Sequence, residues 1–125
     1  MDGAGLAETL DARLQSPLDV LVEVNVGEEP QKTGAPPADV TAVASAVHGS
    51  RHLRLRGLMT VAPMVPDPEA VRSVFRQLRS LRDDMSQRLG LPLPVLSMGM
   101  TDDYAIAVEE GATMLRLGRA LFGPR

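Results

Sequence analysis

Stretches typical of helices and of strands alternate along the whole chain, and this alternation limits the possible folds more than any other feature. The expected helices are residues 4–15, 36–48, 68–89, 101–110 and 118–122, and the expected strands are residues 18–26, 55–60, 93–98 and 112–117. Apolar residues recur every three or four positions in an amphipathic helix and every second position in a half-buried strand. Alternating elements with short connections predict an α/β fold, in which helices pack on a parallel sheet.

The helix over residues 68–89 is the best defined of these elements. Asp67 is a suitable N-cap, Pro68 suits the first helical position, and Gly90 suits the C-terminal end. Its apolar residues are expected to be buried, and they are Val71, Val74, Phe75, Leu78, Leu81 and Met85. Such a stripe predicts that the helix packs along the sheet.

The composition excludes several classes of protein. Hydrophobic residues make up 44% of the 125 residues and charged residues 23%, as in a globular domain with a core. With three aromatic side chains and a net charge of −3, binding to nucleic acid is disfavoured. The absence of cysteine excludes disulfides and thiol chemistry. No apolar run approaches the ~20 residues of a membrane span, and we expect a cytoplasmic protein.

The histidines and the lysine also limit the chemistry. His48 and His52 are four residues apart, but Gly49 and Ser50 break the helix between them, which argues against a metal site. Lys32 is the only lysine among thirteen basic residues, so a Schiff base has one side-chain candidate.

Polar groups follow the predicted strands, at the edge of the sheet where parallel α/β folds bind ligands. They comprise Asn25, the loop with Lys32, residues 59–60, residues 97–101 and residues 116–119. This clustering predicts a ligand site at the C-terminal ends of the strands.

The turn after the third strand has two interpretations. Ser97, Gly99 and Thr101 offer hydroxyls and an approachable backbone at the start of a helix, which suits an anion such as phosphate. Thr101 is also a good N-cap and is followed by Asp102 and Asp103, so the residues by themselves favour an ordinary strand-to-helix connection over an anion site. The anion site stays open as the second interpretation, because the motif falls short of a Gly-rich phosphate loop.

With these residues placed, the chain resembles the pyridoxal phosphate homeostasis family. The motifs that carry the resemblance are VEVNV (22–26) with KTG (32–34), LRLRGLM (53–59), LSMGMTDD (96–103) and RLGRALFG (116–123). They follow one another in the family's order over nearly the whole chain. The resemblance implies a fold-type III, alanine racemase-like TIM barrel that binds pyridoxal 5′-phosphate (PLP).

The resemblance also implies roles for particular residues. Ser97 and Gly99 would contact the cofactor phosphate, Gly118 and Arg119 would add backbone amides to it, and Arg116 would face the pyridine nitrogen. An arginine keeps its proton, so the ring would stay unprotonated and be a poor electron sink, as suits a carrier. The full set of expected cofactor-binding residues is Asn25, Met59, Ser97, Gly99, Thr101, Arg116, Gly118 and Arg119.

One difference from the family limits which of its residue roles can be assigned to this chain. A (β/α)₈ barrel takes ~250 residues, whereas residues 1–125 match its C-terminal half, strands five to eight, as a single partial domain. The family's aldimine lysine lies on the first barrel strand, to which nothing here corresponds. Lys32 matches the family's Lys-Ser/Thr-Gly loop instead, so the Schiff-base role is not transferred to it.

A half barrel would have open first and last strands. The chain could pair with a second copy, dock with a separate N-terminal half, or be a truncated product. The main functional hypothesis is a non-catalytic PLP-binding protein of intracellular PLP homeostasis. The alternatives are a PLP-dependent, alanine racemase-like enzyme, for which the catalytic lysine is missing, and a structural half barrel without cofactor.

Overall fold

The computed structural model describes residues 3–27, 34–62, 67–100 and 103–116, which form one parallel sheet with helices packed on it. The strands lie in the order β1 (Leu18–Glu23), β2 (Leu53–Met59), β3 (Val95–Met100) and β4 (Met114–Arg116). The helices are α1 (Gly3–Arg13), the 3₁₀ helix η1 (Pro37–Asp39), α2 (Val40–His48), α3 (Pro68–Leu89) and α4 (Tyr104–Glu109). The predicted α/β fold with about four β/α units is confirmed.

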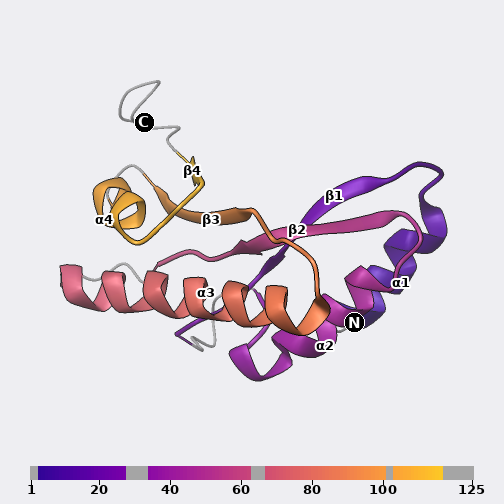
Figure 1. The fold of residues 1–125 in the computed structure, drawn as a ribbon, viewed down its shortest axis with the longest axis horizontal. Coiled ribbons are helices and arrows are strands. Elements are labelled where there is room, and N and C mark those ends of the chain that lie inside the picture. The colour runs from indigo at the N-terminus through magenta and orange to yellow at the C-terminus, as the bar shows by residue number, and fades with distance from the viewer. Residues whose placement is uncertain (1–2, 28–33, 63–66, 101–102, 117–125) are drawn as a thin grey trace.

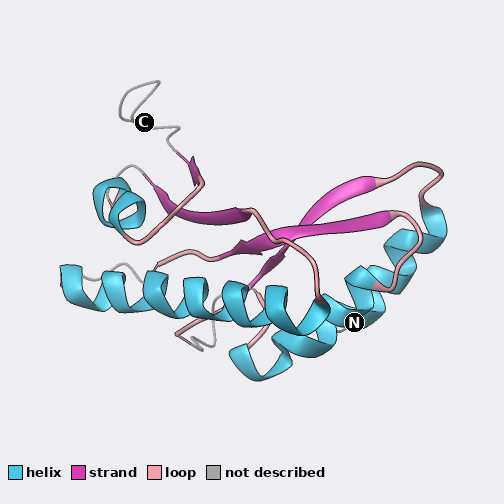
Figure 2. Cartoon of the chain, viewed as in Figure 1, coloured by secondary structure: helices cyan, strands magenta, loops and turns pink. Residues whose placement is uncertain are grey.

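Helices α1, α2 and α3 lie along one side of the sheet, and α4 lies beside β3 (Figures 1 and 2). The core is aliphatic between these layers. Val22, Leu58 and Leu96 occupy one register row of β1, β2 and β3 and are 5%, 0% and 0% exposed. Phe75 and Leu78 of α3 are fully buried in the same core. Burial of this apolar surface is the main driving force for the fold.

Helix α3 has the bounds and caps that its sequence predicts. The Asp67 carboxylate accepts a hydrogen bond from the Glu69 amide at 3.0 Å, and Pro68 takes the first helical position. Gly90 ends the helix in the left-handed conformation, with φ = 67°. The predicted stripe is buried, except that Leu81 is only partly so.

Helix α4 begins later than predicted. It starts at Tyr104, with Asp103 as its N-cap residue, and not at Thr101. The Asp103 carboxylate accepts from the Met100 amide at 2.6 Å, and the Asp103 amide donates to the Met100 carbonyl at 3.2 Å. These bonds form a turn between β3 and the helix, which delays the first helical residue. Thr101 itself lies outside the described residues.

Strand β1 is shorter than the predicted strand 18–26, because its end pairs with a different segment. It stops at Glu23, and Val24 then forms an isolated parallel bridge with Ala35. The predicted last helix, 118–122, lies outside the described residues. In the described part of the chain, no helix is long and apolar enough to cross a membrane.

Candidate functional site

A row of side chains crosses the sheet near the C-terminal ends of its strands. The register pairs Glu23 with Met59, Met59 with Ser97, and Ser97 with Met114. Residues paired across parallel strands project to the same face, and successive residues alternate between faces. This row therefore lies on the face opposite the buried row of Val22, Leu58 and Leu96. Met59 and Ser97, both predicted to lie at this edge of the sheet, are neighbours in the row.

Ser97 is the polar residue of this row that is most suited to an anion. It is 2% exposed, and its carbonyl accepts from the Thr60 amide at 3.0 Å. Within the described segments, its hydroxyl makes no hydrogen bond, whereas the fully buried side-chain atom without a partner is Nδ1 of His52. Because the Ser97 hydroxyl is not among the fully buried polar atoms without a partner, its oxygen keeps some exposure, and a ligand or water can reach it. Ser97 therefore fits the phosphate contact that the sequence predicts.

Gly99 has a structural reason to be glycine. Its φ is 99°, in the left-handed region that favours glycine. A Cβ atom at Gly99 would stand 2.5 Å from the Cβ of Ala107 in α4 and 3.0 Å from Cδ2 of Leu115. The close packing of α4 on β3 thus explains this glycine, and the phosphate contact of Gly99 stays a prediction.

Asn25 lies just past β1, where a returning segment holds the strand's outer edge. The Asn25 amide donates to the Ala35 carbonyl at 2.8 Å, and the Ala35 amide donates to the Glu23 carbonyl at 2.8 Å. Gly34, with φ = 105°, comes so close that a Cβ there would be 3.0 Å from the Asn25 nitrogen. The end of the loop that contains Lys32 is therefore fixed beside Asn25.

The structure places the remaining predicted site residues only in part. Arg116 ends β4, where it pairs with Met100 of β3. Lys32, Thr101, Gly118 and Arg119 lie outside the described residues, and their expected contacts stay predictions.

The sequence placed Thr60 among the polar groups at this edge but gave it no role in the site. Its hydroxyl donates to the Val24 carbonyl at 2.7 Å, and its amide donates to Ser97. A hydroxyl residue that directly follows an apolar strand was the available signal, but the partner of the hydroxyl depends on the pairing of β1 with β2.

Sequence reasoning missed a buried carboxylate at the end of α4. Glu110 is 4% exposed, and its oxygens lie 2.6 Å from Nη1 of Arg72 and 2.9 Å from Nε of Arg76. Hydrogen bonds from Arg76 and then Arg72 lower the pKa of Glu110 below its ordinary value. Nη1 of Arg79 also donates to the Glu110 carbonyl at 3.1 Å. The arginines at spacings of four and three residues along α3 were the sequence signal.

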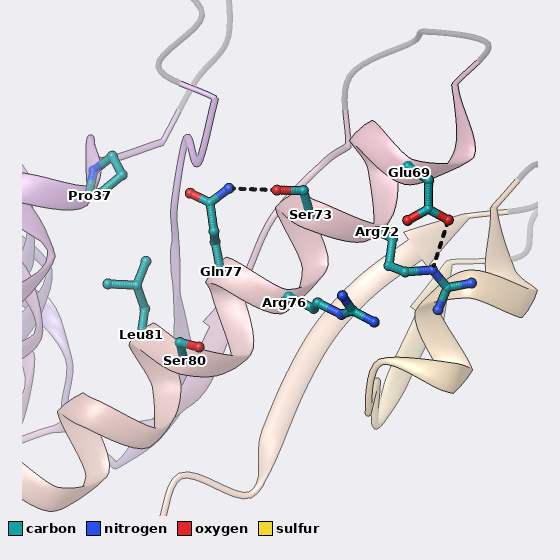
Figure 3. A pocket seen from close by; sticks show the side chains of 8 residues that line it. All are labelled: Pro37, Glu69, Arg72, Ser73, Arg76, Gln77, Ser80 and Leu81. Atoms are coloured by element: carbon teal, nitrogen blue, oxygen red, sulfur yellow. Dashed lines mark hydrogen bonds and ion pairs between the residues drawn. The ribbon is translucent and has the colours of Figure 1, made fainter.

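A groove of about 510 Å³ lies on the outer flank of α3 (Figure 3). Its lining residues are Pro37, Glu69, Arg72, Ser73, Arg76, Gln77, Ser80 and Leu81. None of them belongs to the row of β-strand residues, and Arg72 already pairs with Glu69 and Glu110. Among the described residues, no group of three His, Cys, Asp or Glu side chains is placed to hold a metal ion.

Comparison with known proteins identifies the family to which the chain belongs. The sequence matches the family described as "Alanine racemase, N-terminal domain" over residues 3–125, and the chain belongs to this family. The solved alanine racemase of Corynebacterium glutamicum, at 19% identity and a TM-score of 0.70, shares the fold.

Within that class, the similarity is to pyridoxal phosphate homeostasis proteins. The one from Aquifex aeolicus is 45% identical over 107 residues, which are 86% of this chain and 47% of the relative. The one from Pseudomonas aeruginosa is 46% identical over 109 residues, 87% of this chain and 46% of the relative. The chain thus spans about half the length of these relatives.

A solved relative has been seen with the cofactor. PipY of Synechococcus elongatus, with PLP bound, matches at a TM-score of 0.82 and 34% identity over 95% of this chain and 57% of PipY. A protein of unknown function from Bifidobacterium adolescentis matches at a TM-score of 0.89 and 36% identity over 98% of this chain and 51% of that one. The predicted family resemblance is confirmed.

Proposed function

We propose that the protein binds PLP at the C-terminal ends of its strands and takes part in PLP homeostasis without catalysing a reaction. The observation that carries the proposal is the position of Ser97, a nearly buried residue whose hydroxyl makes no hydrogen bond within the described segments, in register with Met59 at that edge. Membership of the alanine racemase N-terminal domain family and the PLP-bound structure of PipY support it. The cytoplasmic location expected from the sequence stays a prediction.

Different residues would contact the two ends of the cofactor, its phosphate and its pyridine ring. Ser97 would donate its hydroxyl hydrogen to the phosphate, and the backbone of Gly99, Gly118 and Arg119 would approach the same group. Arg116 would donate to the pyridine nitrogen and, because a guanidinium keeps its proton, leave that nitrogen unprotonated. PLP supplies an electrophilic aldehyde and an aromatic electron sink when bound. A ring held in this way is a weak electron sink, which favours a carrier over a racemase-like enzyme.

The open side of β1 fits the rest of a barrel, and we propose that an N-terminal half barrel covers it. A groove of about 760 Å³ lies between α1, β1 and α2, and among its lining residues Leu6 and Leu10 are 50% and 40% exposed. Among the described residues, Ala35 bonds to the outer edge of β1 near Glu23 and Asn25, and no described strand pairs with the earlier part of that edge, which can therefore pair with another strand. The doubled length of the relatives indicates the half that would do so.

The docking proposal can be tested with the unmatched N-terminal half of the Aquifex aeolicus relative as the probe. We expect it to form a one-to-one complex with this chain, as measured by light scattering after gel filtration. Leu10→Asp should abolish the complex, whereas Ser45→Asp, at an exposed position of α2, should leave it intact. A homodimer of this chain that excludes the added half would overturn the proposal in favour of a second copy.

PLP binding is tested by titrating the purified chain with PLP and following the cofactor absorbance, with and without borohydride. We expect saturable binding that Lys32→Ala leaves unchanged, because the family's covalent lysine lies outside the matched half. A borohydride-fixed adduct that Lys32→Ala abolishes would overturn the assignment of Lys32. No saturable binding, alone or with the N-terminal half added, would overturn the proposed function.

A further inference from the structure

We propose that Thr60 is a positioning residue, which ties the ends of β1 and β3 to β2 and so sets the spacing between Asn25 and Ser97. The inference rests on the proposed function, because the edge that Thr60 fixes is the edge assigned to the cofactor.

Thr60 follows the last residue of β2, and its polar groups reach both neighbouring strands. Its hydroxyl donates to the Val24 carbonyl at 2.7 Å, on the β1 side. Its amide donates to the Ser97 carbonyl at 3.0 Å, on the β3 side. The preceding carbonyl, of Met59, accepts from the Val24 amide at 2.8 Å. The dipeptide Met59–Thr60 therefore joins three strand ends.

The joined residues are the neighbours of the site, or belong to it. Val24 directly precedes Asn25, and Ser97 carries the hydroxyl proposed to bind phosphate. Any sideways shift of β1 relative to β3 would change the distance between Asn25 and Ser97. Ligand affinity depends steeply on such preorganisation, since a site that must be ordered on binding loses part of its interaction energy.

Because Thr60 is buried, water would not replace the hydrogen bond of its hydroxyl if that bond were lost. Thr60 and Val24 are each 1% exposed, so bulk water is not at hand to replace a lost bond at the Val24 carbonyl. The same burial distinguishes positioning from direct binding. A hydroxyl that donates to a buried carbonyl, on a side chain with 1% exposure, is not presented to a ligand.

Variants that differ only in the hydroxyl test the inference. Thr60→Val keeps the shape of the side chain and removes the hydroxyl. If Thr60→Val does not fold, Thr60→Ser, which keeps a hydroxyl, is compared with Thr60→Ala, which has none. Thr9→Val is the matched control, because the Thr9 hydroxyl donates at 3.0 Å to the Gly5 carbonyl within α1, away from the strand ends. The measurements are PLP affinity and backbone hydrogen exchange of peptides 22–27 and 95–100.

We expect Thr60→Val and Thr60→Ala to weaken PLP binding about tenfold and to speed exchange in both peptides, and Thr60→Ser to bind as wild type does. Thr9→Val should change neither measurement. If the wild type binds PLP and the variants without the hydroxyl bind equally well, positioning is overturned and the proposed function stands. If the wild type binds no PLP, either alone or with the N-terminal half added, the proposed function fails and hydrogen exchange alone tests the role of Thr60. In that case, hydrogen exchange that Thr60→Val leaves unchanged would overturn the role of Thr60 in joining the strand ends, and faster exchange in both peptides would support it.

Discussion

Oε2 of Glu110 lies 2.6 Å from Nη1 of Arg72, and this pair joins the end of α4 to the side of α3. The Glu110 side chain is 6% exposed, whereas Glu109, whose Oε2 lies 2.7 Å from Nη2 of the same arginine, is 59% exposed. Removing one partner of a buried pair leaves the other charge uncompensated. The contact between α3 and α4 therefore depends on the ionised form of Glu110.

The first prediction concerns the pH dependence of stability. The pKa of Glu110 is lowered in the folded state, mainly by hydrogen bonds from Arg76 and Arg72. A carboxyl whose pKa falls on folding stabilises the protein above its unfolded-state pKa, about 4.3 for glutamate, and loses this contribution as the pH falls through the folded-state value. We expect Glu110→Gln to lower the melting temperature at pH 7, and the difference from wild type to shrink as the solution becomes more acidic.

Glu69→Gln is the matched control for this prediction. Glu69 lies 3.7 Å from the same arginine, but its side chain is 77% exposed, so its contribution is screened by water. The control should change the melting temperature little at either pH. An equal effect of both substitutions, or a Glu110→Gln effect that does not depend on pH, would contradict the role given to the buried carboxylate.

The second prediction concerns Gly57, where β2 runs directly against β3. A Cβ atom at Gly57 would overlap the carbonyl oxygen of Val95, and backbone cannot move aside as a flexible side chain can. Gly57→Ala should therefore destabilise the fold by about 3 kcal/mol or more, as severe overpacking does. Urea unfolding measures this loss.

Gly90→Ala separates this clash from a conformational effect. Gly90 has φ = 67° but no atom within 4 Å of an added Cβ, so only the left-handed backbone opposes alanine there. That cost is about 1–2 kcal/mol. If Gly57→Ala proves no more destabilising than Gly90→Ala, the claim that β2 and β3 approach too closely for a side chain at residue 57 is wrong.

Elements fixed by local signals could be predicted from the sequence, and those fixed by distant contacts could not. The bounds of α3 follow from Asp67, Pro68 and Gly90, which act within one helical turn of each end. The start of α4 does not, because the Asp103 carboxylate accepts from the Met100 amide and inserts a turn before the helix. Nothing in the local sequence ranks Asp103 above Thr101 as the cap.

The same distinction applies to the candidate site. Met59 and Ser97 were predicted to lie at the same edge because parallel strands end at one edge of a sheet. Their shared row with Glu23 requires the register of β1, which shifts between Val20 and Leu21 and leaves Arg56 without a partner. A shift of this kind depends on the pairing of two strands more than thirty residues apart, so alternation within one strand does not reveal it.

The third prediction concerns the cap of α3. The Asp67 carboxylate satisfies the Glu69 amide, one of the donors that the first helical turn leaves free. Asp67→Ala should lower the free energy of unfolding by about 1 kcal/mol. Asp67→Asn keeps a side-chain oxygen that can accept the same bond and should restore most of the loss. Equal losses for alanine and asparagine in thermal unfolding would show that the cap contributes nothing measurable.

The last prediction separates the phosphate end of the proposed cofactor site from the rest of it. A hydrogen bond to a charged group contributes about 1.5–3 kcal/mol, so Ser97→Ala should weaken PLP binding about tenfold to a hundredfold. Pyridoxal, which has the same ring and aldehyde but no phosphate, should bind the wild type and Ser97→Ala equally well. Ser45→Ala, on the exposed face of α2, controls for general effects of losing a serine. Fluorescence titrations with both compounds measure the affinities. A parallel loss of pyridoxal and PLP binding would mean that Ser97 supports the sheet and not the phosphate, because only a phosphate contact can distinguish the two ligands.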